Sequence, residues 1–138
     1  MVIGEVVPPL SGLDIQGETV SLSRFKGKVL VLFFWKSSCC GDKLKLLEPY
    51  YRLNRDKGVA LLAINTGDAR SVVESFAAAG AVTFPMQSDE YAMTARQYGV
   101  FGFPTLFIID RQGMLQRKIM GDISVSQLDK LVAPQLVQ

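Results

Sequence analysis

The sequence contains no histidine and only two cysteines among its 138 residues. Histidine is the usual general base at neutral pH and the commonest metal ligand in proteins. Its absence argues against zinc and copper sites, and also against a nucleophile activated by a cysteine and histidine pair. We therefore expect neither a metal nor a cofactor.

The sequence also lacks a large excess of charge of either sign. Its 15 basic and 13 acidic residues are interspersed and leave a net charge of +2. There is no basic stripe, and no aromatic residues are interleaved with arginines. This pattern argues against nucleic acid as a partner.

Long hydrophobic runs are absent as well. The apolar stretch that starts at Val29 is closed by Lys36 after seven residues, which is far short of a membrane span. The first five residues lack the charged region and the apolar stretch of a signal peptide. The chain is therefore either a cytoplasmic protein or the mature domain of an exported one, and two cysteines are too few to tell these compartments apart.

The apolar content is nevertheless high, at 49% of the residues. A chain of this length and composition buries a core without the help of disulfides. We find no internal repeat, linker or low-complexity segment, and we expect one domain over residues 1–138.

A run of seven apolar residues, Val29 to Trp35, precedes the only two cysteines. Its β-branched and aromatic side chains are typical of a strand buried on both faces. After Cys39 and Cys40 the apolar residues recur every three to four positions, which is the period of a helix. The two thiols are thus expected at a strand-to-helix turn. There the helix dipole favours the thiolate, the form of sulfur that attacks disulfides and peroxides.

Two further apolar runs, residues 59–65 and 105–109, predict two more buried strands. The first follows a helix that ends near Lys57, so it should pair in parallel with the strand before the cysteines. The second leads through a turn at residues 110–113 into an antiparallel return over residues 114–120.

Three further helices are expected, at residues 71–79, at residues 89–98 and after Ser124. Ser71 with Glu74 and Ser124 with Gln127 have the spacing of capping boxes. A small hairpin is expected between residues 10 and 22. The predicted fold class is α/β, with a mixed central sheet, helices on both faces and an N-terminal hairpin.

Two segments carry the signature of a known family. In the first, Gly27 to Trp35 is followed by Cys39, four residues after the tryptophan; in the second, residues 98–100 lead to Gly102-Phe103-Pro104-Thr105. In this order they resemble the thioredoxin-like thiol-disulfide oxidoreductases of the alkyl hydroperoxide reductase/thiol-specific antioxidant (AhpC/TSA) superfamily. The pattern is closest to extracytoplasmic reductases that serve cytochrome c biogenesis. The likeness covers nearly the whole chain.

The resemblance implies a thioredoxin-like fold and a role in cell redox homeostasis or extracytoplasmic thiol maintenance. It favours a periplasmic or extracytoplasmic location with the targeting segment absent from this chain, and the alternative is a cytoplasmic one. The implied partners are a protein or small-molecule disulfide or thiol substrate and an external thiol reductant. We expect a monomer.

Several site residues follow from the resemblance. Cys39 falls on the attacking cysteine of the Cys-x-x-Cys motif. Pro104 falls on a cis-proline that faces this cysteine and presents the backbone of Phe103 to an incoming peptide. Trp35 is expected either to contact substrate or to cover the core. Asp68 matches an acidic position near the active site, and its alternative role is to cap the next helix.

One departure from the family pattern changes the chemistry. The second cysteine of the motif should be residue 42, which is Asp42, whereas Cys40 lies directly beside Cys39. Adjacent Cα atoms are about 3.8 Å apart, below the usual disulfide range, so a disulfide between these two requires a strained peptide unit and should be easily reduced. Asp42 either accepts a proton near the sulfur or weakens the redox centre by raising the thiol pKa.

Three functions remain open at this point. In the first, Cys39 attacks a substrate disulfide, and Cys40 or an external thiol such as glutathione resolves the mixed disulfide. In the second, the protein is a thiol peroxidase, with Ser37 three residues before Cys40 but Phe33 where such sites have proline. In the third, it is a binding module that keeps the groove but has lost turnover.

Overall fold

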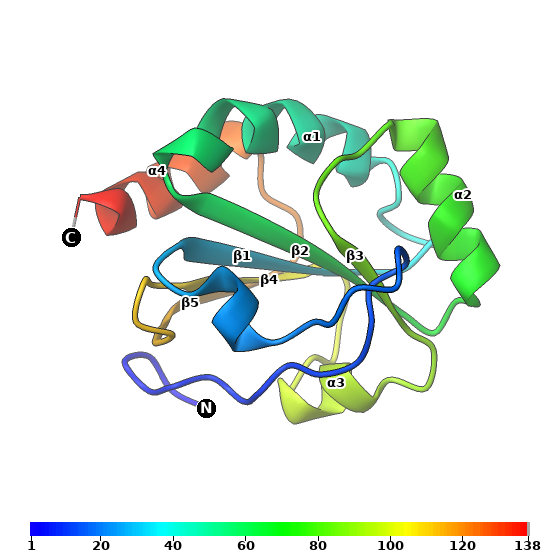
Figure 1. Cartoon of the computed structure of the whole chain (residues 1–138), viewed down its shortest axis with the longest axis horizontal. Helices are drawn as coiled ribbons and strands as arrows, with labels where there is room; N and C mark the ends of the chain where they lie inside the picture. Colours follow the sequence, from blue (N-terminus) through cyan, green and yellow to red (C-terminus); the bar gives the residue numbers. More distant parts are fainter. Residues whose placement is uncertain (138) are drawn as a thin grey trace.

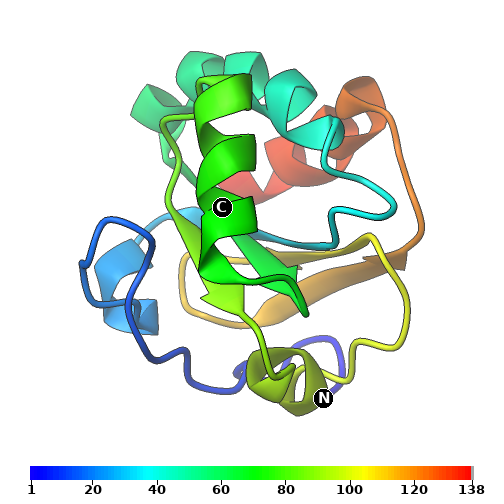
Figure 2. The same ribbon diagram turned by 90° about the vertical axis from the view of Figure 1, so that its right-hand side faces the viewer.

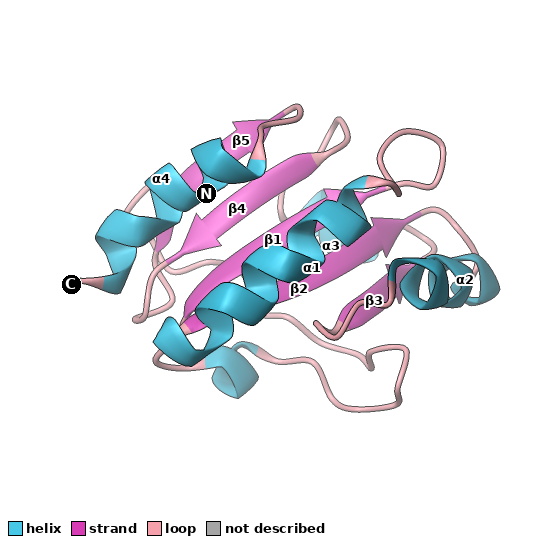
Figure 3. Cartoon of the chain, turned by 90° about the horizontal axis from the view of Figure 1, so that it is seen from above, coloured by secondary structure: helices cyan, strands magenta, loops and turns pink. Residues whose placement is uncertain are grey.

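The computed structural model describes residues 1–137 and contains a central sheet of five strands in the order β3-β2-β1-β4-β5. Figure 3 shows this sheet from the side of its helices. The strands are β1 (Val29–Trp35), β2 (Val59–Thr66), β3 (Met86–Asp89), β4 (Thr105–Ile109) and β5 (Leu115–Met120).

Helices cover both faces of the sheet. They are α1 (Lys43–Asn54), α2 (Arg70–Gly80), α3 (Met93–Gln97) and α4 (Val125–Leu136), with short 3-10 helices at Leu22–Phe25 and Arg55–Lys57. Helices α1 and α4 lie across one face, and α3 lies on the other with the N-terminal segment (Figure 1). Helix α2 lies beside β3 and is the green helix nearest the viewer in Figure 2. None of the helices among residues 1–137 is long and apolar enough to cross a bilayer.

Strand register brings three loops together at one end of the sheet, where β1 and β2 finish and β4 begins. Strand β1 runs parallel to β2, with Trp35 opposite Asn65, and antiparallel to β4, with Phe34 opposite Thr105. The end of β1, the end of β2 and the start of β4 therefore meet. The segments that follow or precede them carry the cysteines, Asp68 and Pro104.

The core has two halves because β1 is buried on both faces, with every residue of the strand at most 2% exposed. Alternate side chains of a strand point to opposite faces. Val29, Val31, Phe33 and Trp35 pack toward α1, α2 and α4. Leu30, Leu32 and Phe34 pack toward α3 and the N-terminal segment. This arrangement confirms the predicted buried strand and the mixed sheet with helices on both faces.

Other local predictions are partly wrong. The Ser71 and Glu74 capping box is wrong, because α2 begins at Arg70 after Ala69 and has no side-chain cap. The Ser124 and Gln127 box is confirmed, with both of its hydrogen bonds present. The N-terminal hairpin is reduced to a single bridge between Leu13 and Thr19.

The predicted helix over residues 89–98 begins too early. Asp89 ends β3, opposite Thr66 in the sheet. Its carboxylate accepts hydrogen bonds from the amides of Thr94 (3.2 Å) and Ala95 (2.9 Å). The acidic residue thus satisfies the amides of α3 from outside the helix.

Candidate active site

The two cysteines lie in the turn between β1 and α1, coloured cyan in Figure 1 at the end of the sheet where β1 ends. Cys39 is exposed and Cys40 is half-buried. Their sulfur atoms are joined in a disulfide, and their Cα atoms are 3.7 Å apart. The amides of both residues donate to the carbonyl of Lys36, at 3.3 and 3.2 Å. The predicted strand-to-helix location is confirmed, with the helix itself beginning at Lys43.

Asp68 ties this turn to the end of β2. Its carboxylate accepts hydrogen bonds from the Ser37 amide (2.9 Å), the Ser37 hydroxyl (2.8 Å) and the Asn65 side-chain amide (2.8 Å). Partial burial works to raise the pKa of Asp68, but the hydrogen bonds from Asn65 and Ser37 and the charge of Lys36 outweigh it, so the pKa is lowered. The carboxylate is therefore ionised at neutral pH.

The alternative role of Asp68 as a helix cap is wrong. The residue at the cap position of α2 is Ala69, and no side chain makes a capping hydrogen bond there. Asp68 instead fixes the residue that starts the cysteine turn. The acid does lie beside the cysteine turn, as the family resemblance implied.

The loop before β4 lies next to the cysteine turn. The peptide bond between Phe103 and Pro104 is cis, as predicted. The amino group of Lys36 lies 4.8 Å from the centre of the Phe103 ring, within the range of a cation–π contact. Phe103 and Pro104 are both half-buried and so keep part of their surface open to solvent.

Trp35 lies beneath the cysteine turn and is fully buried. Its ring meets that of Phe76 on α2 at 5.3 Å between centroids, in an edge-to-face arrangement. A Cβ atom on Gly41 would come within 2.2 Å of the Phe76 ring, so the turn packs closely on this pair. The burial favours the interpretation in which Trp35 covers the core, because the side chain offers no surface to a substrate in this structure.

Asp42 is exposed at the start of α1, where its side chain makes no capping hydrogen bond. The neighbouring Lys43 points elsewhere: its amino group lies 3.1 Å from the Asp122 carboxylate and donates to the carbonyl of Ile123. Lys43 is thus engaged with the loop before α4. The amino group of Lys36, by contrast, lies over the Phe103 ring in the loop before β4.

Sequence reasoning missed two supports of this site. Asn65 is fully buried and holds Asp68 by two hydrogen bonds. Phe76 is the residue that requires glycine at position 41. A polar side chain at the end of an apolar run was the available signal for Asn65, whereas the contact of Phe76 depends on how α2 packs.

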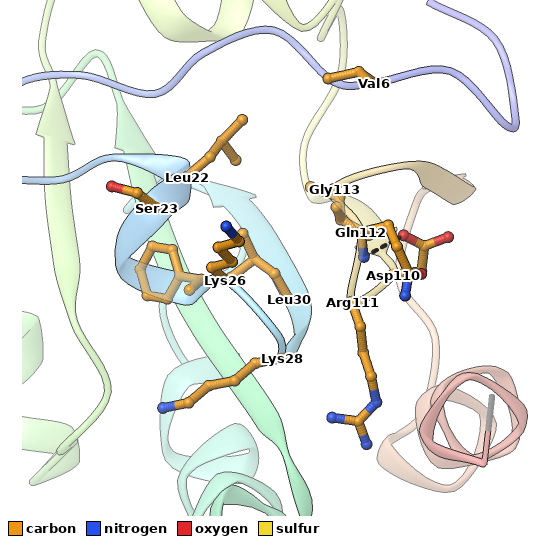
Figure 4. Close-up of a pocket in the computed structure, with 12 residues that line it drawn as sticks. Val6, Leu22, Ser23, Lys26, Lys28, Leu30, Asp110, Arg111, Gln112 and Gly113 are labelled. Carbon is orange, nitrogen blue, oxygen red and sulfur yellow. Dashed lines mark hydrogen bonds between the residues drawn. The ribbon is translucent and has the colours of Figure 1, made fainter.

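A cavity of about 230 Å³ lies away from the cysteines. Figure 4 shows it between Leu22, Lys26 and Leu30 on one side and the turn at Arg111–Gly113 on the other. It adjoins the beginning of β1, whereas the cysteines follow its end, and a seven-residue strand is roughly 20 Å long. This cavity is therefore separate from the cysteine site.

Comparison with known proteins connects this site to a family. A sequence profile described as "AhpC/TSA family" matches residues 3–118. The thiol-disulfide oxidoreductase ResA of Bacillus thuringiensis subsp. konkukian is 30% identical over 132 residues, which cover 94% of this chain and 76% of the relative. ResA of Geobacillus thermodenitrificans is 31% identical over 124 residues, covering 88% and 71%.

Comparison with a solved structure tests the expected fold. A Chlorobium tepidum protein assigned as a thiol:disulfide interchange protein DsbE superposes with a TM-score of 0.90 at 27% identity, and the match covers 99% of each chain. The expected thioredoxin-like fold is confirmed.

Proposed function

This chain belongs to the AhpC/TSA family, and we propose that it is a thiol-disulfide oxidoreductase that acts through Cys39. The observation that carries the proposal is the disulfide-bonded cysteine pair, with Cys39 exposed, beside the cis-proline loop. The ResA relatives are thiol-disulfide oxidoreductases by name, which supports the same chemistry here.

The proposed reaction begins with the reduced pair. The Cys39 thiolate attacks one sulfur of a substrate disulfide, that disulfide breaks, and the departing substrate thiolate takes up a proton. Cys40 then loses its proton and attacks the Cys39 sulfur, which releases the second substrate thiol and leaves Cys39 and Cys40 oxidised. An external thiol reductant returns two electrons and two protons to the pair.

Exposure supports the order of attack. Cys39 is exposed whereas Cys40 is half-buried, so an incoming disulfide reaches Cys39 more easily. In the reduced protein each sulfur would lie near the Lys36 carbonyl oxygen, which is 3.6 and 3.7 Å from the two sulfur atoms in the disulfide form.

Neighbouring residues receive supporting roles in this proposal. Phe103 and Pro104 offer a partly exposed surface and a backbone edge to a substrate peptide. Asp68 positions the turn through its hydrogen bonds to Ser37. Its negative charge raises the pKa of the nearby thiols, because it disfavours the thiolate form. Asp42, exposed and free of a capping bond, is the acceptor of the proton that Cys40 loses before it attacks.

The peroxidase alternative receives less support from the contacts of Ser37. A peroxidase of the expected type would direct this hydroxyl toward the reactive Cys40 sulfur. The Ser37 hydroxyl donates to Asp68 instead, at 2.8 Å. The relatives named ResA are thiol-disulfide oxidoreductases, which also favours disulfide exchange over peroxide reduction.

The remaining parts of the proposal concern partners and place. We propose a protein or small-molecule disulfide as substrate, a thiol as reductant, a monomeric state and a periplasmic or extracytoplasmic location. The likeness to reductases of cytochrome c biogenesis is what supports that location.

Alkylation of the reduced protein tests the assignment of the nucleophile. The reagent is one that alkylates ordinary thiols slowly near neutral pH. Cys40→Ser should still be alkylated, at Cys39, whereas Cys39→Ser should no longer be alkylated. The opposite pattern would remove Cys39 from the role of attacking residue. Circular dichroism of both variants serves as the control for folding.

A further inference from the structure

The reduced cysteine pair has a second chemistry that does not depend on disulfide exchange. We propose that Cys39 and Cys40 form a chelation site for trivalent arsenic, specifically for arsenicals that carry one organic group. Such a compound forms one bond to carbon and two to sulfur. The proposal requires only the reduced pair, so it stands independently of the proposed oxidoreductase function.

The number of donors at the site selects this class of ligand. No cluster of three or more His, Cys, Asp and Glu side chains is arranged to hold a metal ion among residues 1–137. Structural zinc takes four such ligands, so two thiolates alone leave it incomplete. A monosubstituted arsenical already carries its organic group, so two thiolates complete its three bonds. Soft sulfur ligands also suit a soft centre of this kind.

Adjacency in the chain makes the two thiols act together. The Cα atoms of Cys39 and Cys40 are 3.7 Å apart. Their amides share the Lys36 carbonyl as acceptor, which holds both residues in one turn. Once one sulfur has bound, the second is tethered at a high effective concentration. The chelate should therefore be much more stable than a bond to either thiol alone.

The surroundings leave room for the organic group. Cys39 is exposed and Cys40 half-buried, so a substituent on arsenic can extend into solvent while both sulfurs bind. The start of α1 lies three residues beyond Cys40, and a helix N-terminus near a cysteine favours the thiolate that binds such ligands.

The binding step involves no electron transfer. An arsine oxide, R–As=O, reacts with two thiols to give R–As(SR′)2 and one water. Two S–H bonds and the arsenic–oxygen bond break, two As–S bonds form, and both protons leave in the water. Arsenic remains trivalent throughout, and the cysteine pair can no longer form its disulfide.

Phenylarsine oxide is the probe that tests this inference. The protein is reduced with a phosphine, freed of reductant without air and shown to carry two free thiols. Addition of one equivalent of the probe should increase the intact mass by the mass of the probe less one water. The oxidised protein, treated in the same way, should show no adduct.

Competition separates chelation from binding to a single thiol. The adduct of the parent should survive excess glutathione, a monothiol, and be removed by 2,3-dimercaptopropanol, a dithiol. In Cys39→Ser and Cys40→Ser the adduct should be lost to glutathione at a concentration about a hundredfold lower. Folding of the variants is checked by circular dichroism, and the competition on the parent alone does not depend on them.

Two results would overturn the inference. One is that the reduced parent, with both thiols counted, forms no adduct. The other is that glutathione strips the parent as readily as it strips the single variants. Neither measurement uses a disulfide substrate, so failure of the oxidoreductase proposal would leave the outcome readable.

Discussion

Replacement of Asp68 by Asn tests whether this carboxylate holds the cysteine turn. Asn keeps one oxygen that can still accept from the Ser37 and Asn65 amides, which lie 2.9 and 2.8 Å from the same carboxylate oxygen. Its amino group then faces the Ser37 hydroxyl, which can accept in turn. The number of hydrogen bonds is kept, but their charge assistance is lost.

The size of the effect follows from that loss. A hydrogen bond to a charged group contributes about 1 kcal/mol more than a neutral one, so the two amide bonds that the asparagine oxygen still accepts, from Ser37 and Asn65, give a destabilisation of about 2 kcal/mol. For a domain of this size, this corresponds to a decrease of about 1 M in the urea midpoint. Fluorescence of Trp35, the single tryptophan, reports the transition.

The effect should depend on pH in one direction. The pKa of Asp68 is lowered in the folded protein, so its contribution is complete above the unfolded pKa of about 3.9 and is lost as the pH falls through the folded pKa. The difference in stability between parent and Asp68→Asn should be constant above about pH 5 and should shrink below about pH 4. A difference that stays undiminished in acid would refute the reasoning.

Asp14 supplies a matched control. It accepts from the amides of Gln16 (2.8 Å) and Glu18 (3.0 Å) and from Arg24 (2.9 Å), and its pKa is also lowered. Asp14→Asn should lose a similar amount of stability, because it also removes charge-assisted hydrogen bonds. None of these hydrogen bonds involves the cysteine turn, so the thiols should react at the parental rate.

Alkylation then distinguishes the two variants. Asp68→Asn removes a negative charge near the cysteine turn, which should lower the thiol pKa and accelerate labelling of the reduced protein at neutral pH. Equal labelling rates in both variants would show that Asp68 has no electrostatic influence on the thiols.

Three further predictions concern the same region and its support. Gly41→Ala places a Cβ against the Phe76 ring and should cost about 1–3 kcal/mol in urea unfolding, with partial recovery when Phe76→Leu is added; an unchanged midpoint would contradict this packing. The buried Glu48 carboxylate accepts hydrogen bonds from the Thr83 amide (2.7 Å) and hydroxyl (2.8 Å). Glu48→Gln removes the charge from these bonds and should lower the free energy of unfolding by about 1–3 kcal/mol, whereas the rate of thiol labelling should stay as in the parent. Asp42→Cys restores the Cys-x-x-Cys spacing and should increase reduction of a protein disulfide in a turbidity assay, and a folded variant without gain would argue against this register.

The strands were predictable because their signals are local. The seven apolar residues from Val29 to Trp35 are buried at every position, and so are the eight residues of β2, Val59–Thr66, of which the first six are apolar. Such runs leave few alternatives to a strand covered on both faces. The capping box at Ser124 was likewise readable from two residues three apart.

Other features depend on contacts that spacing does not encode. The Ser71 pattern failed because the cap position of α2 is Ala69, two residues before Ser71, and the helix begins at Arg70. The link from Asn65 through Asp68 to Ser37 exists because β1 and β2 pair in a specific register. The family resemblance therefore pointed to the cysteines and the cis-proline of the candidate site, whereas the polar contacts that hold the turn required the structure.

The most direct test of the central claim is a count of free thiols with intact mass after equilibration with oxidised glutathione. The parent should lose both thiols and two hydrogens without retaining glutathione, because Cys40 displaces it from Cys39. Cys39→Ser and Cys40→Ser should each retain a glutathione adduct. Two unreactive thiols in the folded parent, or a parent that keeps glutathione on Cys39 beside a free Cys40, would contradict the assignment of this pair as a redox couple.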